Sequence, residues 1–179
     1  MKVLGISGWS GSGKTALITR LVPLLRKRGL RVVVVKHAHH TFDIDIPGKD
    51  SFQHRAAGAV EVIIASSRRI AQITELEDAP APKLADLLWR VSACDLVLVE
   101  GFKAEAHPKL EVFRSKNGSP PLHPADPATI AIASDAAFPD AKIPCVNVND
   151  LDAIADLVVR SAADIEEVIE RLEGHGPTQ

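Results

Sequence analysis

An eight-residue motif near the start of the chain narrows the possible folds more than any other part of the sequence. A short apolar run precedes the motif at residues 2–7, and leucines at helical spacing follow it up to Gly29, where a helix would end. We therefore expect a strand, a glycine-rich loop and a helix in this order. The motif has the pattern G-x-x-x-x-G-K-[ST] and consists of Gly8, Trp9, Ser10, Gly11, Ser12, Gly13, Lys14 and Thr15.

The residue types in this motif suit a polyphosphate. Glycines let successive backbone N–H groups point inward at phosphate oxygens, and the following helix adds the positive end of its dipole. Lys14 would supply a charge to the β- and γ-phosphates, which also makes it a candidate catalytic residue, and the Thr15 hydroxyl would ligate Mg²⁺. The alternative is a glycine-rich turn that contains Lys and Thr by chance. The full match in the required context favours a nucleoside triphosphate site.

Length and composition indicate one folded domain. The chain has 179 residues, of which 46% are hydrophobic and 25% are charged, as in average globular proteins. We expect a single nucleotide-binding domain over residues 1–173 and a frayed tail over residues 174–179. The formal charge of −2 argues against a protein that coats nucleic acid or membrane. No apolar run approaches the roughly 20 residues that span a bilayer, and no signal peptide is recognisable, so we expect a cytoplasmic location.

Apolar runs alternate with segments of helical period along the rest of the chain. Residues 31–36 and 95–101 are rich in Val and Leu without alternation, which is typical of strands covered on both faces in a parallel sheet. Residues 59–65 and 69–75 indicate an antiparallel hairpin, and residues 151–172 indicate one long C-terminal helix. The pattern predicts an α/β fold of the P-loop NTPase type, with three layers, a mainly parallel sheet and an antiparallel hairpin extension.

A carboxylate is expected near the Mg²⁺ ion of a P-loop, at the end of a buried strand beside the first strand. Glu100 ends the buried run at 95–101, which makes it the candidate metal ligand together with Thr15. Asp95 begins the same run and would lie at the opposite edge of the sheet, some 15 Å away by strand rise. The alternative for Glu100 is an exposed acid at the end of a strand.

The polar loop between residues 36 and 51 holds a second group of candidates. Asp43 or Asp45 would reach the Mg²⁺ ion or orient an attacking water, which makes both candidate catalytic residues, and Lys49 would meet a phosphate. The imidazoles of His37, His39 and His40 also invite a transition-metal site, although no Cys accompanies them. The remaining alternative is a solvated loop without a ligand.

Four motifs in the chain resemble those of the MobB family of molybdopterin-guanine dinucleotide biosynthesis adaptor proteins. The likeness runs from Met1 to about Asp152, and the four motifs follow one another in the family's order. They are residues 8–15, the segment at 36–51 that contains Lys-His-Ala-His-His and Pro-Gly-Lys-Asp-Ser, residues 55–59, and residues 95–103 with Glu100-Gly101-Phe102-Lys103.

This resemblance implies a GTP-binding protein with weak GTPase activity that uses Mg²⁺. Such a protein assists the guanylyltransferase MobA, by delivering nucleotide or by holding partner enzymes together, including enzymes that carry molybdopterin. The resemblance also implies a homodimer, to which the hairpin at 59–75 contributes. Residues 8–15 would bind phosphates, Thr15 and Glu100 would serve Mg²⁺, and residues 37–51 would respond to nucleotide or contact a pterin or a partner.

The choice of base is open on the residues themselves. The [NT]-K-x-D box by which many GTPases read guanine is absent from the sequence. Asp135 follows a late strand and is a candidate acceptor for the guanine N1 and N2 positions, or else a turn acid. Two other functions remain open. One is a small-molecule kinase or ATP-dependent ligase with Asp43 or Asp45 as its base, and the other is a metallochaperone GTPase that uses the histidines.

Overall fold

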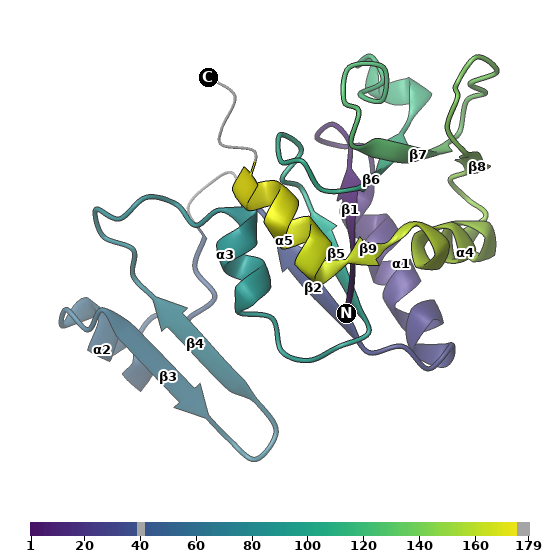
Figure 1. The fold of residues 1–179 in the computed structure, drawn as a ribbon. Helices are drawn as coiled ribbons and strands as arrows, with labels where there is room; N and C mark the ends of the chain where they lie inside the picture. The colour runs from purple at the N-terminus through teal and green to yellow at the C-terminus, as the bar shows by residue number, and fades with distance from the viewer. Residues whose placement is uncertain (39–41, 175–179) are drawn as a thin grey trace. The chain divides into compact units, whose positions relative to one another are not determined.

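The computed structural model describes residues 1–38 and 42–174 (Figure 1). The chain divides into two compact units, one formed by Met1–His37 together with the chain from Lys83 onward, and one formed by Ala38–Pro82. Gly174 ends the last helix, and the rest of the predicted tail lies outside the described residues. Among the helices of the described ranges, none has the length and apolarity that a membrane crossing requires.

A sheet of parallel strands forms the centre of the first unit. Its strands lie in the order β2-β5-β1-β6-β7-β8. Strands that follow one another in the sequence, such as β1 and β2, are therefore not always neighbours in the sheet. Such crossover connections are expected for the predicted α/β class. The strands are β1 (Lys2–Ser7), β2 (Val32–Lys36), β5 (Leu96–Glu100), β6 (Lys109–Phe113), β7 (Thr129–Ser134) and β8 (Cys145–Asn147).

Helices cover both faces of this sheet and give the three predicted layers. Helices α1 (Lys14–Lys27) and α4 (Leu151–Ser161) bury their apolar sides on one face, in a cluster with the leucines of β5. Helices α3 (Leu84–Trp89) and α5 (Ile165–Gly174) pack on the other face against the valines of β5. All five residues of β5 are buried, which explains its continuous apolar sequence.

The C-terminal helix differs from the prediction, because the segment forms two helices rather than one. Between α4 and α5 the chain forms β9 (Ala163–Asp164), which pairs antiparallel with Lys2 and Val3 of β1. The two helices then pack on opposite faces of the sheet. The apolar residues keep a helical spacing across the break. The sequence pattern therefore does not reveal the interruption, which is due to the pairing of β9 with β1.

Strand β2 differs from the prediction in its burial. The strand exists and pairs in parallel with β5, but it lies at the edge of the sheet. Its residues are half-buried or exposed, and Val34 is exposed to 42%. A run of valines is therefore compatible with an edge strand as well as with a central strand.

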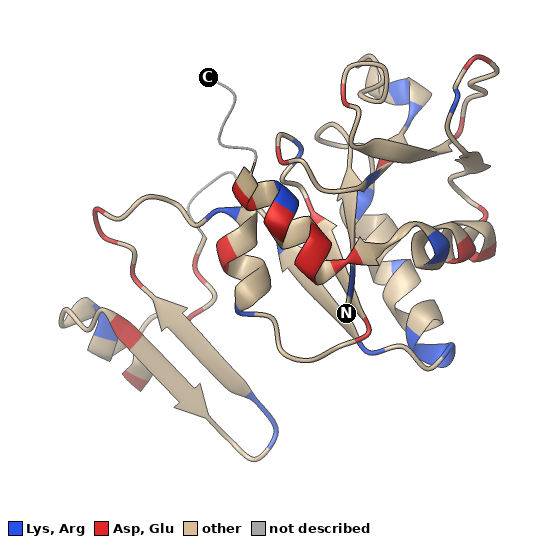
Figure 2. Cartoon of the chain, in the orientation of Figure 1, with Lys and Arg blue, Asp and Glu red and all other residues tan. Residues whose placement is uncertain are grey.

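The second unit contains the predicted hairpin. Strands β3 (Glu61–Ala65) and β4 (Ile70–Thr74) pair antiparallel as a two-stranded sheet, and helix α2 (Asp50–Ala56) precedes them. Figure 2 shows that the two strands are largely free of charged residues, with basic residues in the turn between them. Large apolar side chains of this hairpin are exposed, Ile63 to 62% and Ile70 to 74%.

Candidate functional site

The glycine-rich motif connects the carboxyl end of β1 to the first turn of α1. Gly8 has a φ of 139°, and a Cβ at this position would lie 2.5 Å from the Val112 carbonyl oxygen. Gly13, at the N-cap of α1, has a φ of 92°. Both positions favour glycine, the first because of its close approach to β6 and both because of their positive φ. The loop thus wraps tightly at the edge of the sheet where α/β folds place their ligands.

Lys14 is the first residue of α1, and its side chain folds back onto the preceding loop. Its Nζ atom donates hydrogen bonds to the carbonyl oxygens of Gly8, at 2.8 Å, and of Trp9, at 2.9 Å. Burial lowers the pKa of the Lys14 ammonium group; the charge of Glu100 opposes this effect, and the charges of Lys103 and Lys36 add to it. The ammonium group is therefore held at the loop and lies close to other positive charges.

Thr15 and Glu100 meet at the first turn of α1. The Thr15 hydroxyl donates a hydrogen bond of 2.5 Å to Oε1 of Glu100, whose side chain is 9% exposed. The Nζ atom of Lys36 lies 3.7 Å from the same carboxylate oxygen. Asp95 is at the other end of β5, where its carboxylate accepts a hydrogen bond from the Arg31 backbone N–H. Of the two acids considered from the sequence, Glu100 is the one beside Thr15.

One buried hydroxyl of this loop has room for a polar ligand as its partner. Ser12 is 2% exposed, and its hydroxyl has no hydrogen-bond partner in the described part of the chain. A buried hydroxyl without a partner costs free energy, which a phosphate oxygen or a bound water would offset. The oxygens of Thr15 and Glu100 are ligands of the kind that Mg²⁺ prefers, so the residues present fit a magnesium-bound phosphate.

A loop between β6 and β7 holds the outer side of the motif. Asn117, in a short 3₁₀ helix (Ser115–Asn117), donates a side-chain hydrogen bond to the Ser10 carbonyl at 3.0 Å. The indole N–H of Trp9 donates to the Pro120 carbonyl at 2.7 Å, and the Lys103 ammonium group lies 4.5 Å from the centre of the Trp9 ring. Sequence reasoning missed Asn117 and Lys103 as neighbours of the motif, because their positions depend on the order of the strands.

Asp135 follows the carboxyl end of β7, as expected. One of its oxygens accepts a hydrogen bond of 2.8 Å from the backbone N–H of Ser115, and the other lies 4.0 Å from Arg114. The hydrogen bond from Ser115 is the main reason why the pKa of Asp135 is lowered. Asp135 is therefore an ionised acceptor, and it is already paired in part with its own neighbours.

Asp43, Asp45 and Lys49 belong to the second unit, where the two carboxylates bind Arg55. Arg55 lies 3.0 Å from Asp43, 3.3 Å from Asp45 and 2.6 Å from Glu75. The hydrogen bond from Arg55 lowers the pKa of Asp43, and a hydrogen bond from Ser51 contributes most to the lowered pKa of Asp45. Lys49 forms the N-cap of α2. The Ser51 hydroxyl, in the first turn of α2, donates a hydrogen bond to Asp45 at 2.8 Å.

Of the three histidines considered for a transition-metal site, His37 lies within the described residues. The ring of His37 stacks on Phe102 at a centroid distance of 4.6 Å. His39 and His40 lie outside the described residues. Within residues 1–38 and 42–174, no three His, Cys, Asp or Glu side chains are grouped as a metal site would require.

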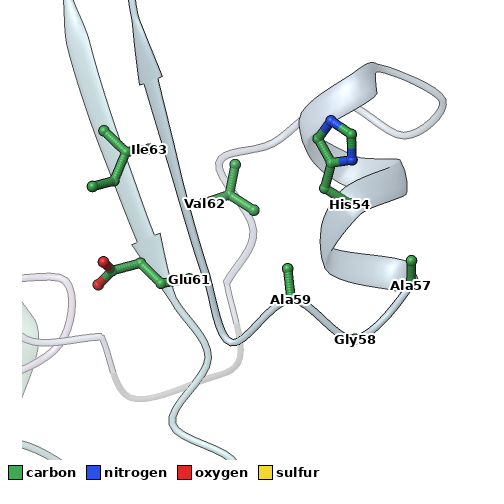
Figure 3. Close-up of a pocket in the computed structure, with 7 residues that line it drawn as sticks. All are labelled: His54, Ala57, Gly58, Ala59, Glu61, Val62 and Ile63. Atoms are coloured by element: carbon green, nitrogen blue, oxygen red, sulfur yellow. The ribbon is translucent and has the colours of Figure 1, made fainter.

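The second unit has an open cavity of about 530 Å³ between α2 and β3 (Figure 3). Its walls combine small and apolar side chains with two polar ones, and none of the predicted site residues contributes to it. The residues that line it are His54, Ala57, Gly58, Ala59, Glu61, Val62 and Ile63.

The fold and the loop together define an α/β protein with a P-loop motif at the carboxyl edge of a mainly parallel sheet, beside a buried acid on the neighbouring strand. The sequence model of the family described as MobB, molybdopterin guanine dinucleotide synthesis protein B, matches residues 3–135. The chain therefore belongs to the MobB family.

Individual relatives agree with this family. The chain is similar to the molybdopterin-guanine dinucleotide biosynthesis adapter proteins of Escherichia coli (strain K12) and of Haemophilus influenzae. The first is 42% identical, over 88% of this chain and 91% of the relative, and the second is 39% identical, over 87% and 86%. A crystal structure of molybdopterin-guanine biosynthesis protein B (mobB) superposes with a TM-score of 0.69, at 29% identity, over 88% of this chain and 98% of that chain.

Proposed function

We propose that the chain is a GTP-binding adaptor that assists the MobA guanylyltransferase in making molybdopterin-guanine dinucleotide, and that it hydrolyses GTP slowly. The observation that carries the proposal is the contact of Thr15 with the buried Glu100. It lies next to a P-loop in which the Lys14 ammonium group donates a hydrogen bond to the Gly8 carbonyl. Membership of the MobB family and the names of the relatives support the pathway.

In this proposal residues 8–15 bind the phosphates of GTP, and Thr15 and Glu100 hold Mg²⁺. The bound ion would neutralise charge on the β- and γ-phosphate oxygens. Lys14 adds a positive charge at the same loop. Residues of this site therefore bind and orient the nucleotide, and their contribution to bond cleavage is electrostatic.

The pairing of the two candidate bases agrees with the slow hydrolysis proposed here. Asp43 and Asp45 are paired with Arg55, and their pKa values are lowered. An effective general base has a pKa near the working pH, so neither carboxylate is prepared to take a proton from an acceptor. This favours an adaptor over a small-molecule kinase or ligase, and it gives Asp43 and Asp45 the role of holding Arg55.

Guanine recognition is assigned to Asp135, whose ionised carboxylate stands after β7 and suits the N1 and N2 donors of guanine. The partners in the proposal are MobA and enzymes that carry molybdopterin, and the working form is a homodimer joined through the hairpin of β3 and β4. The reaction takes place in the cytoplasm, where GTP is supplied.

Isothermal titration calorimetry with GTP and with ATP, each with Mg²⁺, tests the proposal. We expect GTP to bind more tightly than ATP in the wild type, and Lys14→Ala to lose most of the affinity for GTP. Lys27→Ala is the matched control, because Lys27 is exposed at the far end of the same helix. A tenfold preference for ATP would exclude the guanine assignment. Unchanged affinity in Lys14→Ala would mean that the P-loop does not bind the phosphates.

A further inference from the structure

Three lysine side chains, Lys14, Lys36 and Lys103, lie close enough together for the charges of the last two to act on the first, and the proposed function uses Lys14 alone among them. Lys14 lies in the P-loop, Lys36 lies 3.7 Å from Glu100, and Lys103 lies over the ring of Trp9. Like charges at short range repel one another. A group of three cations with one carboxylate is therefore a site that favours a strongly anionic ligand.

The sheet places Lys36 beside Glu100, the proposed metal ligand. Glu100 pairs in register with Ile6 of β1 and with Lys36 of β2, so β5 lies between the P-loop strand and Lys36. Register partners in parallel strands project to the same face. Alternate residues of β5, Leu96 and Leu98, pack in the core cluster that includes α1, so Glu100 and Lys36 share the face on which α1 begins.

Lys36 lies close enough to Lys14 for its charge to act on the Lys14 ammonium group. The charge of Lys36 contributes to the lowered pKa of Lys14, after burial and after Lys103. The ammonium group of Lys36 also lies within ion-pair distance of Glu100. Its side chain is 57% exposed, so the ammonium group is accessible to a ligand that arrives from solvent.

We infer that Lys36 binds the terminal phosphate of a nucleoside triphosphate, and that it makes the chain prefer the triphosphate over the diphosphate. The inference rests on the proposed function. Lys36 lies beside the proposed metal ligand Glu100, on the strand that follows β5 when the sheet is read outward from β1. A metal held by Glu100 would supply charge to the terminal phosphates, and the Lys36 ammonium group would then be free to contact the last phosphate.

A simpler role for Lys36 makes a different prediction. An exposed lysine that only pairs with Glu100 contributes little, as surface ion pairs do, and its removal would change the affinities for GTP and GDP by the same factor. A lysine that contacts only the last phosphate changes the affinity for GTP and leaves that for GDP nearly constant. The ratio of the two affinities therefore separates the two roles.

The experiment is calorimetric titration of GTP and of GDP, in excess Mg²⁺, into the wild type, Lys36→Ala, Lys36→Arg and the control Lys27→Ala. We expect Lys36→Ala to weaken GTP binding about tenfold or more, which is the range of one charge-assisted hydrogen bond, and to weaken GDP binding less than about threefold. Lys36→Arg keeps the charge and should recover part of the preference for GTP. Lys27→Ala should match the wild type.

Equal loss of affinity for both nucleotides in Lys36→Ala, or no loss for either, would overturn the inference while leaving the proposed function intact. A wild-type chain that binds neither nucleotide would remove the proposed function itself, and the inference with it. Thermal unfolding of each variant checks its fold. Lys36→Gln, which keeps the length of the side chain better, gives a second reading of the same ratio.

Discussion

In the proposed function, the buried carboxylate of Glu100 is a ligand of Mg²⁺. Its Oε1 atom accepts a hydrogen bond from Thr15, and an amide oxygen can accept the same bond. Glu100→Gln therefore preserves the contact and removes the charge. We expect the gain in GTP affinity on adding Mg²⁺ to fall about tenfold or more in this variant, as for other changes around metal sites.

Asp95→Asn is the matched control for this substitution. It makes the same chemical change at the other end of β5, and the amide oxygen of this variant would still accept the hydrogen bond from the Arg31 N–H. Titration of GTP with and without Mg²⁺ measures both variants. A magnesium effect that is lost equally in Asp95→Asn, or kept in Glu100→Gln, would argue against Glu100 as the metal ligand.

His107 links the stability of the chain to pH. The residue is fully buried beside Lys109, and burial, followed by the charge of Lys109, lowers its pKa to about 3. Below the ordinary pKa of about 6.5 the unfolded chain binds a proton that the folded chain does not bind. The contribution to stability is therefore complete above pH 6.5 and is lost as the pH falls from there toward 3.

We expect the free energy of unfolding to drop more steeply between pH 7 and pH 5 in the wild type than in His107→Leu. The difference over this range should be roughly 2 kcal/mol, because each pH unit below 6.5 contributes about 1.4 kcal/mol. Urea unfolding at several pH values measures the slope, which is independent of any constant loss from the substitution. Parallel slopes would show that His107 does not titrate as its burial requires.

At the scale of elements, the packing of β1 against β6 depends on the small size of Gly5. A Cβ at this position would clash with the imidazole ring of His107 and would lie 2.7 Å from Cγ of Lys109. Both of these side chains are buried, so they cannot move aside into solvent. We expect Gly5→Ala to reduce the free energy of unfolding by about 2 kcal/mol or more.

Gly174→Ala is the control for this prediction, because it exchanges glycine for alanine at a position where a Cβ meets no atom within 4 Å. Chemical denaturation compares the two variants with the wild type. Similar stabilities for Gly5→Ala and the wild type would mean that β1 and β6 can separate at little cost.

The sequence pattern predicted correctly those elements whose residue types directly reflect how the element is buried or how it turns. The run that became β5 is apolar throughout because the strand is covered on both faces, and the hairpin is marked by two short runs with a turn between them. Position in the sheet is not a local property. Val34 lies at an edge, and Ala163 interrupts a helical pattern, because of strands that are distant in sequence.

The same distinction holds for the site. Lys14 and Thr15 follow from one continuous motif, and Glu100 follows from its place at the end of a buried run. Lys36 reaches Glu100, and Asn117 reaches the motif, from other segments of the chain. Their neighbourhood depends on the order of β2, β5 and β1 and on the loop after β6, which the sequence does not reveal without the topology.

At the scale of the whole molecule, the second unit exposes apolar surface that a separate monomer would leave in water. Ile63 and Ile70 project from the same face of the hairpin, by their register, and are exposed to 62% and 74%. A two-stranded hairpin is also marginally stable without further partners. Exposed apolar surface of this kind marks an interaction site, which agrees with the proposed homodimer.

We expect Ile70→Lys to turn a dimeric wild type into a monomer at micromolar concentration. In a symmetric dimer each substitution occurs twice, and burial of one isoleucine contributes about 1.5–3 kcal/mol, so the dissociation constant should rise at least about a hundredfold. Val159→Lys is the control, because it places the same charge at an exposed apolar position of α4. Sedimentation velocity over a range of concentrations measures the mass. If Ile70→Lys sediments like the wild type, or if Val159→Lys dissociates as readily, the hairpin is not the surface that joins the two copies.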